Sequence, residues 1–361
     1  MSRIFNVAVI GAGIGRSHIV EGYVPNASQF KVKVLCDHNV ERMTPIADEF
    51  GIERRVTNFD DVLAMDDIDV IDICTPPMLH FPMVMAALKA GKHVICEKPL
   101  VGSLAQVDEV IAEEKRSRGL LMPVFQYRFG NGIEQAKAII DAGIAGKPFM
   151  GTVETLWRRD APYYAVPWRG KWATELGGVL MGHAIHPHDL FTYLMGDIER
   201  VFGRVATRVN PIEVEDTISA SLLMQSGALA SLTATLGSAD DMTRIRLAFE
   251  NVSFESDHAA YNPGDKLWQI QPRNDETAHK IAALLKDWKN VPSRFQTQMA
   301  RFYDALIGAA PLPVTSADSR RSLELVTAFY HSSATGEDVA LPIGPGHPLY
   351  ESWVPAQFRA A

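Results

Sequence analysis

The sequence predicts a two-domain α/β protein, in which an N-terminal doubly wound parallel sheet precedes an α/β domain with a large, mainly antiparallel open sheet. Two patterns predict it. The first part of the chain alternates apolar runs with helix signals, and after Gly146 the runs alternate in polarity or are rich in β-branched residues. The length of 361 residues, of which 47% are hydrophobic, suits about two globular domains. We therefore expect a first domain over 1–125 and a second over 126–361.

The strands expected in the first domain are apolar runs without alternation, which suits strands covered on both faces. A helix is expected to end at Gly91, and Ser103 with Gln106 forms a capping box that opens another, closed by Gly119. The expected strands are 6–10, 31–36, 70–74, 93–96 and 120–125, and the expected helices are 83–90 and 104–118.

The second domain is predicted to contain a sheet whose strands are joined by short turns. Two helices follow, and then a tail from Leu341 that is rich in Pro and Gly. We expect the tail to form an extended arm on the surface or across a subunit contact. One face of an open sheet would otherwise be exposed, so we expect a homodimer or homotetramer. The expected strands are 153–157, 201–209, 217–224, 228–236, 244–249 and 267–270, and the expected helices are 187–194, 293–307 and 316–333.

Composition excludes several classes of protein. A net charge of −8 and a pI near 5.8 disfavour a nucleic-acid partner. The chain enters a strand without a signal peptide, and no apolar stretch approaches the ~20 residues that cross a bilayer, so we expect a cytoplasmic protein without a membrane partner. The three cysteines, Cys36, Cys74 and Cys96, end apolar runs and fit no zinc pattern, which indicates buried, reduced thiols.

A glycine turn, Gly11-Ala12-Gly13-Ile14-Gly15, lies between the first strand and a helix. Glycine lets the backbone turn tightly and approach a pyrophosphate, and the helix N-terminus offers free N–H groups to the phosphates. The third glycine comes one residue earlier than in the strict G-x-G-x-x-G pattern, where Arg16 stands. A tight structural turn is the alternative interpretation. The strand–turn–helix context favours a Rossmann-type dinucleotide site.

Asp37 ends the second strand, where a carboxylate accepts hydrogen bonds from the adenosine ribose and repels a 2′-phosphate. It is also placed to cap the next helix. No arginine immediately follows it, so we expect NAD rather than NADP.

Glu97-Lys98-Pro99 stands where a parallel strand ends, the sheet edge at which open α/β sheets bind ligands. A lysine beside a nicotinamide and partly desolvated can take a hydroxyl proton while hydride leaves the carbon. A surface lysine is the alternative interpretation of this tripeptide taken alone.

The motifs taken in order resemble the glucose–fructose oxidoreductase / inositol dehydrogenase (Gfo/Idh/MocA) family over nearly the full chain. The resemblance rests on the glycine turn, Asp37, Thr75-Pro76-Pro77 with His80, Ala90-Gly91-Lys92-His93-Val94 leading into Glu97-Lys98-Pro99, Leu176-Gly177-Gly178, His186-Pro187-His188-Asp189 and Leu341-Pro342-Ile343.

The resemblance implies roles for several residues. Lys98 would be the catalytic acid/base, and Glu97 would bond the nicotinamide ribose. The Lys98–Pro99 bond would be a candidate for the cis form. Thr75, Pro76 and His80 would line the cofactor cleft, Tyr127 and Arg128 would lie near the nicotinamide, and His186 would be the active-site histidine.

The residues around His186 support that assignment independently. Pro187 suits the first turn of a helix, so His186 stands at the helix start, and Asp189 lies three residues on, able to orient the imidazole and contact substrate. A metal site of His183, His186, His188 and Asp189 is the alternative, but no further ligand cluster supports it and we expect no metal.

Position 182 departs from the family pattern. Four residues before its active-site histidine the family usually carries Asp or Asn to hold a substrate hydroxyl, and here that residue is Gly182. Neighbouring His183 is expected to take over part of that work, and the substrate rather than the chemistry is placed in doubt.

The segment 157–172 is dense in aromatic and cationic side chains, which suit sugar rings, carboxylates or phosphates. A packed loop at a domain or subunit boundary is the alternative. The expected substrate contacts there are Arg158, Tyr164, Trp168 and Arg169.

The sequence therefore predicts an NAD(P)-dependent dehydrogenase that oxidises a secondary alcohol of a sugar, glycoside or cyclitol, with Lys98 as acid/base and His186 assisting. One alternative is an enzyme that uses transient oxidation to cleave or epimerise a glycoside. Another is a non-catalytic cofactor-binding sensor on the same fold.

Overall fold

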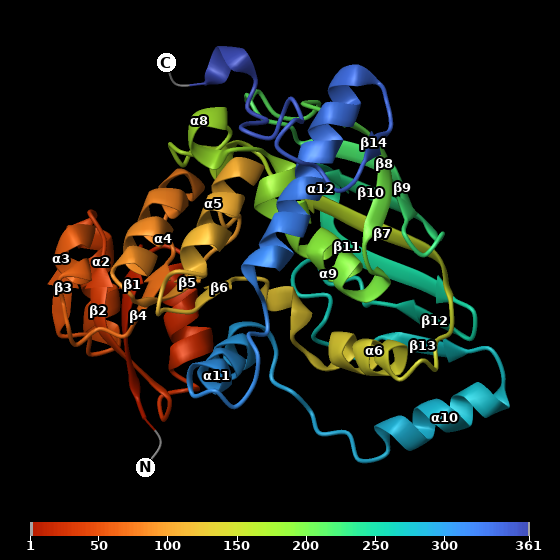
Figure 1. The fold of residues 1–361 in the computed structure, drawn as a ribbon, viewed down its shortest axis with the longest axis horizontal. Coiled ribbons are helices and arrows are strands. Elements are labelled where there is room, and N and C mark those ends of the chain that lie inside the picture. Colours follow the sequence, from red (N-terminus) through yellow and green to blue (C-terminus); the bar gives the residue numbers. More distant parts are fainter. Residues whose placement is uncertain (1–2, 360–361) are drawn as a thin grey trace. The chain divides into compact units, whose positions relative to one another are not determined.

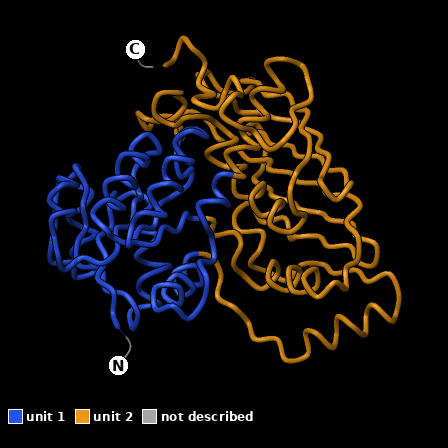
Figure 2. Tube along the Cα trace, viewed as in Figure 1, with its two compact units in different colours: residues 1–124, 295–320 blue, residues 125–294, 321–361 orange. Residues whose placement is uncertain are grey.

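Two sheets organise the fold, one in each of two units, in a computed structural model that describes residues 3–359. Figure 2 shows the division: unit 1 runs to Val124 and takes back Phe295–Arg320, and unit 2 comprises Phe125–Arg294 and the chain from Arg321 onward. The segment expected as a helix over 293–307 therefore belongs with the first sheet, although it follows the whole second sheet in the sequence.

Unit 1 is built on a six-stranded parallel sheet of order β3-β2-β1-β4-β5-β6. The strand order reverses between β1 and β4, which makes the turns that follow these two strands the topological switch point. Its strands are β1 (Phe5–Ile10), β2 (Phe30–Cys36), β3 (Arg54–Val56), β4 (Val70–Ile73), β5 (His93–Cys96) and β6 (Leu121–Pro123).

The helices of unit 1 begin where the capping residues indicate. The Asn39 side chain accepts the N–H of Arg42, and the predicted capping box is confirmed, because Ser103 accepts the N–H of Gln106 while Gln106 accepts the N–H of Gly102. The helices are α1 (Gly15–Ser17), η1 (His18–Tyr23), α2 (Val40–Glu49), α3 (Phe59–Leu63), η2 (Pro77–Leu79), α4 (His80–Lys89), α5 (Leu104–Glu114) and α11 (Arg294–Leu306), which begins at the unit boundary.

Unit 2 contains an eight-stranded sheet of order β13-β12-β11-β7-β10-β9-β8-β14 (Figure 1). Neighbouring strands are antiparallel except for the parallel pair of β7 and β10. The strands are β7 (Pro148–Arg158), β8 (Ile198–Ala206), β9 (Thr217–Met224), β10 (Leu229–Thr235), β11 (Gly237–Phe249), β12 (Val252–Glu255), β13 (Gln269–Pro272) and β14 (Val339–Ala340).

One face of this sheet packs against helices, and burial alternates along β9 and β10 as expected for such a sheet. The alternation leaves serine and threonine side chains on the other face. The helices of unit 2 are η3 (Gln126–Arg128), α6 (Asn131–Asp141), α7 (Ala161–Tyr164), α8 (Trp172–Glu175), η4 (Leu180–Ala184), α9 (Ile185–Met195), α10 (Asp275–Leu285), α12 (Ser316–Thr335, which starts in unit 1) and η5 (Ala356–Phe358).

The predicted fold class is confirmed in both units. Among the elements that the sequence patterns missed are the short strands β3, β12 and β14 and the helices α3, α6 and α10, the last of which is mostly exposed. The three cysteines are buried free thiols, as expected. No helix within residues 3–359 is long and apolar enough to cross a membrane.

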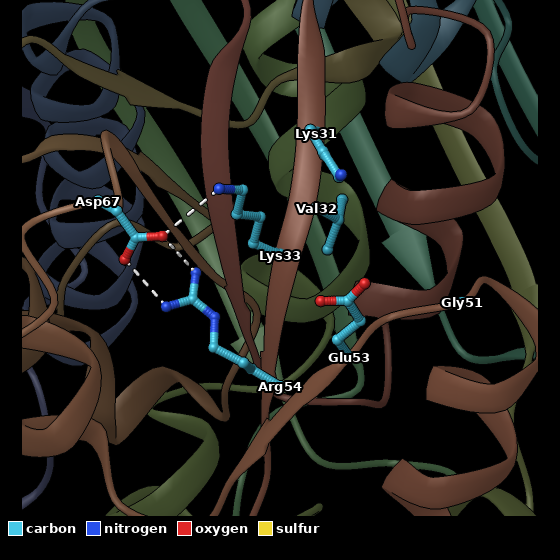
Figure 3. A pocket seen from close by; sticks show the side chains of 7 residues that line it. All are labelled: Lys31, Val32, Lys33, Gly51, Glu53, Arg54 and Asp67. Atoms are coloured by element: carbon cyan, nitrogen blue, oxygen red, sulfur yellow. Dashed lines mark hydrogen bonds and ion pairs between the residues drawn. The ribbon is translucent and has the colours of Figure 1, made fainter.

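A shallow pocket of about 290 Å³ lies at the amino ends of β2 and β3 (Figure 3). Arg54 and Lys33 both point toward Asp67 there, with Arg54 donating to both carboxylate oxygens. Parallel sheets bind ligands at the carboxyl ends of their strands. This pocket is therefore at the opposite edge from the glycine turn, and its Arg54, Lys33 and Asp67 charges are paired with one another.

Candidate cofactor and substrate sites

Two of the three glycines in the turn after β1 are required by close packing, and the third is not. Gly11 has a φ of 102°, and a Cβ there would lie 2.6 Å from the Cys74 carbonyl oxygen. A Cβ on Gly15 would lie 2.7 Å from Cγ1 of Val9, so the third glycine packs the helix against the sheet although it comes one residue early. A Cβ on Gly13 would meet nothing within 4 Å.

Gly13 is therefore the glycine that packing does not explain. Its φ is outside the left-handed region and its outward side is open. In Rossmann turns the second glycine lets the backbone approach the pyrophosphate, the first makes the turn, and the third packs helix on strand. The three positions here divide the same tasks, so the turn fits a dinucleotide and not merely a tight connection.

Asp37, at the end of β2, is hydrogen-bonded to the backbone of this turn. Its Oδ2 accepts the N–H of Ala12 at 2.7 Å, and its Oδ1 accepts the N–H of Asn39 at 2.8 Å. The Arg42 guanidinium donates to both oxygens. Burial opposes ionisation of Asp37, but these N–H groups and Arg42 outweigh it and lower its pKa. The predicted ribose-binding carboxylate is thus ionised and held beside the glycine turn.

Glu97 and Lys98 follow β5 at the same edge of the sheet. The Lys98–Pro99 peptide bond is cis, as expected. Glu97 is buried, with Oε1 bonded to Nε2 of His18 at 3.0 Å and Oε2 accepting the Lys98 N–H at 3.0 Å. Lys98 itself is only partly buried. The carboxylate is fixed in the interior while the lysine reaches the surface of the unit.

His80 ties two neighbouring loops of this edge together. Its Nδ1 lies 2.7 Å from the Pro99 carbonyl oxygen and its Nε2 lies 2.8 Å from that of Thr75. His80 is fully buried, and burial lowers its pKa. Thr75 and Pro76 are half-buried at the switch point. His80, predicted to line the cofactor cleft, thus braces the loops that carry Thr75 and Pro99.

In unit 2, His186 stands in the first turn of α9 and is stacked on Tyr127, with ring centroids 4.7 Å apart. Asp189 is predicted from the sequence to orient the imidazole. Its carboxylate forms a buried bidentate pair with Arg128, at 2.6 and 2.7 Å. Tyr127, Arg128, His186 and Asp189 thus lie together, as a stacked pair beside an ion pair. Lys98 belongs to unit 1 and His186 to unit 2.

The aromatic and cationic segment forms a cluster around Tyr163. Arg169 packs over the rings of Tyr163 and Trp168, with its guanidinium 3.9 and 4.4 Å from their centroids. The His183 ring is 5.5 Å from that of Tyr163. Of the other predicted contacts, Tyr164 meets Tyr163 edge-on, whereas Arg158 is exposed and paired with Asp160.

Two family models match the chain. Residues 5–125 match the oxidoreductase family with an NAD-binding Rossmann fold, and residues 133–255 match the GFO/IDH/MocA C-terminal domain. The chain belongs to the Gfo/Idh/MocA family. It is accordingly an NAD-dependent dehydrogenase, and its N-terminal unit is the NAD-binding domain, which confirms the predicted family, enzyme class and cofactor.

Several similar proteins of the Gfo/Idh/MocA family are named for a sugar, glycoside or cyclitol substrate. The chain is 30% identical over 236 residues to the uncharacterized oxidoreductase YrbE of Bacillus subtilis, covering 64% of this chain and 67% of YrbE. It is 28% identical over 262 residues to levoglucosan dehydrogenase of Pseudarthrobacter phenanthrenivorans, covering 64% and 67%. The structure of the WlbA dehydrogenase from Bordetella pertussis, in complex with NADH and UDP-GlcNAcA, superposes with a TM-score of 0.84 at 25% identity, covering 95% of this chain and 99% of WlbA.

Glu175 is a residue of this Gfo/Idh/MocA protein that sequence reasoning missed. It is buried, accepts the Gly170 N–H at 2.5 Å and lies 3.5 Å from Nη1 of Arg169. A Cβ on Gly182 would lie 3.7 Å from Oε1 of Glu175. The carboxylate thus faces the position where the family usually carries an acid or amide. Seven residues separate the two positions, so only the fold brings them together.

Proposed function

We propose that this protein oxidises a secondary alcohol of a sugar, glycoside or cyclitol, with transfer of hydride to NAD. The observation that carries the proposal is the shared sheet edge: the glycine turn with its open Gly13, the ionised Asp37 and Lys98 all stand at the carboxyl ends of strands of one parallel sheet.

The proposed binding of the dinucleotide uses this chain's own groups. The N–H groups of the glycine turn receive the pyrophosphate, Asp37 accepts the adenosine ribose hydroxyls, and Glu97 accepts from the nicotinamide ribose. Thr75 and Pro76 border the nicotinamide half, braced by His80. When bound, NAD supplies the hydride acceptor.

The proton chemistry belongs to Lys98 and His186. Lys98 in its neutral form takes the substrate hydroxyl proton as the carbinol carbon loses hydride, so that the alcohol becomes a ketone and Lys98 an ammonium. His186, oriented by its stack on Tyr127, hydrogen-bonds the same hydroxyl oxygen. Arg128 and Asp189 hold that helix start in place through their buried pair.

The substrate end is proposed to be the cluster around Tyr163. Sugar rings present apolar faces to aromatic side chains and hydroxyls to charged ones. Trp168 and Tyr164 supply faces, Arg169 and His183 supply donors, and Glu175 supplies a carboxylate acceptor. Arg158, exposed and paired with Asp160, is proposed to contact only the outer part of a larger ligand such as a glycoside.

The test compares the wild type with Lys98→Ala and with Lys89→Ala, an exposed lysine of α4, as the matched control. Each is assayed for NADH formation against polyols, aldoses, uronates and glycosides, and for NAD binding by calorimetry. We expect Lys98→Ala to bind NAD yet lose turnover by about a hundredfold or more. Full activity of Lys98→Ala would refute the proposed acid/base. NADH that fails to accumulate in step with substrate loss would favour cleavage or epimerisation through transient oxidation.

We further propose a homo-oligomer that associates through the open face of the unit 2 sheet. That face carries Ser219, Ser221 and Ser231, and the exposed Leu229 and Met150 pair with each other on the neighbouring strands β10 and β7. Light scattering of the wild type and of Ser221→Arg compares the two masses. A wild-type dimer or tetramer that Ser221→Arg dissociates supports this interface, and a wild-type monomer contradicts it.

A further inference from the structure

A buried cluster of polar side chains lies inside unit 1, in contact with Glu97. His18 at the start of η1 stands between two carboxylates, with Nδ1 2.9 Å from Oδ2 of Asp72 and Nε2 3.0 Å from Oε1 of Glu97. Tyr23 donates to Asp72 at 2.8 Å. Asp72 lies on β4 and Glu97 follows β5, two strands that are neighbours in the sheet (Figure 1).

The geometry constrains the protons. Both gaps between the ring of His18 and a carboxylate are hydrogen-bond distances, and each such gap needs one proton. A neutral imidazole carries only one N–H, so either His18 is an imidazolium or one of the carboxyl groups is protonated. Either way the three groups together carry one negative charge in a region without solvent, since His18 and Asp72 are both 0% exposed.

The charges favour the imidazolium. Burial opposes a positive His18, but the charge and hydrogen bond of Asp72 outweigh it and raise the pKa of His18 well above its usual value. Burial likewise opposes ionisation of Glu97, but His18 and then Lys98 lower its pKa. Two further neighbours of His18 carry no positive charge: the Cys74 thiol and the ring of Phe295 on α11.

A metal site does not explain this cluster, although ligand atoms of His18, Asp72 and Cys74 lie within 4.8 Å of one another. Burial raises the pKa of the Cys74 thiol, so the thiolate that a metal requires is disfavoured. Nδ1 of His18 is already bonded to Asp72. A proton relay to solvent through Tyr23 does not explain it either, because within residues 3–359 the hydrogen bonds on that side end at Tyr23, which is buried.

We propose that His18 is a positioning residue, clamped by Asp72 and Tyr23, that holds Glu97 in one orientation as a carboxylate and thereby fixes the turn that presents Lys98. The inference rests on the proposed function of Lys98. Glu97 uses one oxygen for His18 and the other for the N–H of Lys98, so it cannot rotate without breaking one of them. Replacing His18 with a neutral group leaves two buried carboxylates, one of which must take a proton.

The first experiment needs no substrate. Nitrogen NMR of the whole enzyme with labelled histidine, in which the His18 signals are identified by their loss in His18→Gln, reports the protons on both ring nitrogens. We expect His18 to be doubly protonated at about pH 7 in the wild type, and to lose a ring proton at a lower pH in Asp72→Asn than in the wild type. A His18 that is already neutral at about pH 7 in the wild type would overturn the proposal, whether or not the enzyme turns over any alcohol.

The second experiment measures the consequence for catalysis. The pH profile of kcat is compared among the wild type, Tyr23→Phe, Asp72→Asn and the control Tyr303→Phe, a buried tyrosine of the same unit that packs on Phe5 and Phe30. We expect Asp72→Asn to lower kcat about tenfold and to move the acidic limb of its profile by about one pH unit, Tyr23→Phe to move it less, and Tyr303→Phe to leave it in place.

The variants also separate positioning from folding. Tyr23→Phe removes only one hydroxyl group. It can therefore still be assayed if Asp72→Asn unfolds at too low a temperature. A loss of kcat with an unmoved pH profile in both variants would overturn the positioning role. If none of the tested alcohols supports NAD reduction by the wild type, the proposed function fails. The NMR result still decides the protonation state of His18.

Discussion

The guanidinium of Arg42 donates to both carboxylate oxygens of Asp37, at 3.1 and 2.8 Å. Asp37 is almost fully buried, whereas Arg42, in the first turn of α2, is half-exposed. The carboxylate that excludes a 2′-phosphate is therefore accompanied by a cation that could receive one once the carboxylate is gone.

We predict that Asp37→Ser shifts preference toward NADP. Removing the carboxylate ends the repulsion and frees the Arg42 guanidinium for the phosphate. The ratio of kcat/KM for NADP to that for NAD should rise at least about tenfold, which corresponds to about 1.4 kcal/mol. Steady-state kinetics with both cofactors measures it. The double variant Asp37→Ser/Arg42→Ala should lose most of the gain, and an equal gain in the double variant would show that Arg42 plays no part.

Two glycines of one turn should respond oppositely to the same substitution. Gly13→Ala places its methyl in open space, so melting should be unchanged while the dissociation constant for NAD rises about tenfold or more. Gly15→Ala forces the methyl against Val9 and should cost about 1–3 kcal/mol of stability. Calorimetric melting and NAD titration of both variants decide it. A destabilised Gly13→Ala would mean that the turn is structural at that position as well.

The parts of this protein that sequence could predict are those set by short-range chemistry. The glycine turn, Asp37 and the Ser103–Gln106 capping box each depend on neighbours a few residues away and on a strand–turn–helix context. Apolar runs located most strands of unit 1, and alternating polarity or β-branched composition located most strands of unit 2. The Arg42–Asp37 pair was missed because its partners are five residues apart across a helix start.

The parts that sequence could not predict are pairings made by the fold. His18 meets Asp72 and Glu97 across 54 and 79 residues, and nothing in the local pattern at His18 marks it. The spacing of His186 and Asp189 indicated only that they share a helix face. The carboxylate of Asp189 binds Arg128, which lies 61 residues earlier in the chain. The periodicity of the sequence does not predict where Arg128 lies.

Glu175 and Gly182 should be coupled in function. If Glu175 accepts a substrate hydroxyl in place of an acid at position 182, Glu175→Gln should lower kcat/KM for the best sugar about tenfold. Gly182→Asp alone sets two carboxylates against each other and should also be harmful. The double variant should recover activity relative to Glu175→Gln. A double-mutant cycle on kcat/KM measures the coupling, and strictly additive losses would contradict it.

Glu215 should make stability fall as the solution becomes less acidic. Its Oε1 accepts the N–H groups of Gly178 and Leu180 and its Oε2 the hydroxyl of Tyr330, yet burial raises its pKa to about 7 from 4.5. The folded state thus holds a proton that the unfolded chain releases above about pH 4.5. The free energy of unfolding should fall by about 3 kcal/mol between about pH 4.5 and pH 7 on this account.

The isosteric Glu215→Gln variant isolates that contribution. It cannot titrate, so its stability relative to wild type should increase with pH across this window, as measured by urea unfolding at several pH values. Glu199→Gln, an exposed glutamate of β8, should give a difference that does not vary with pH. A flat difference for Glu215→Gln would mean that the Glu215 carboxyl ionises at its ordinary pKa.

His188 should act in the opposite direction. It is buried on α9 against Phe329, and neither ring nitrogen has a hydrogen-bond partner within residues 3–359. Burial lowers its pKa to about 3, so the folded state excludes a proton that the unfolded chain binds below about pH 6.5. Stability from this residue is therefore intact above about pH 6.5 and is lost as the pH falls, by about 3 kcal/mol at pH 4.

We predict that His188→Leu removes this acid sensitivity. At pH 7 the variant should be about 1–3 kcal/mol more stable, because unpaired polar atoms leave the interior, and the gain should grow at pH 4. Urea unfolding at the two pH values measures both gains, with His279→Leu, an exposed histidine of α10, as the control. A His188→Leu protein that is less stable at both pH values would contradict the prediction. It would show that the imidazole has a partner, such as an internal water, whose hydrogen bond stabilises the fold by more than burial of the imidazole destabilises it.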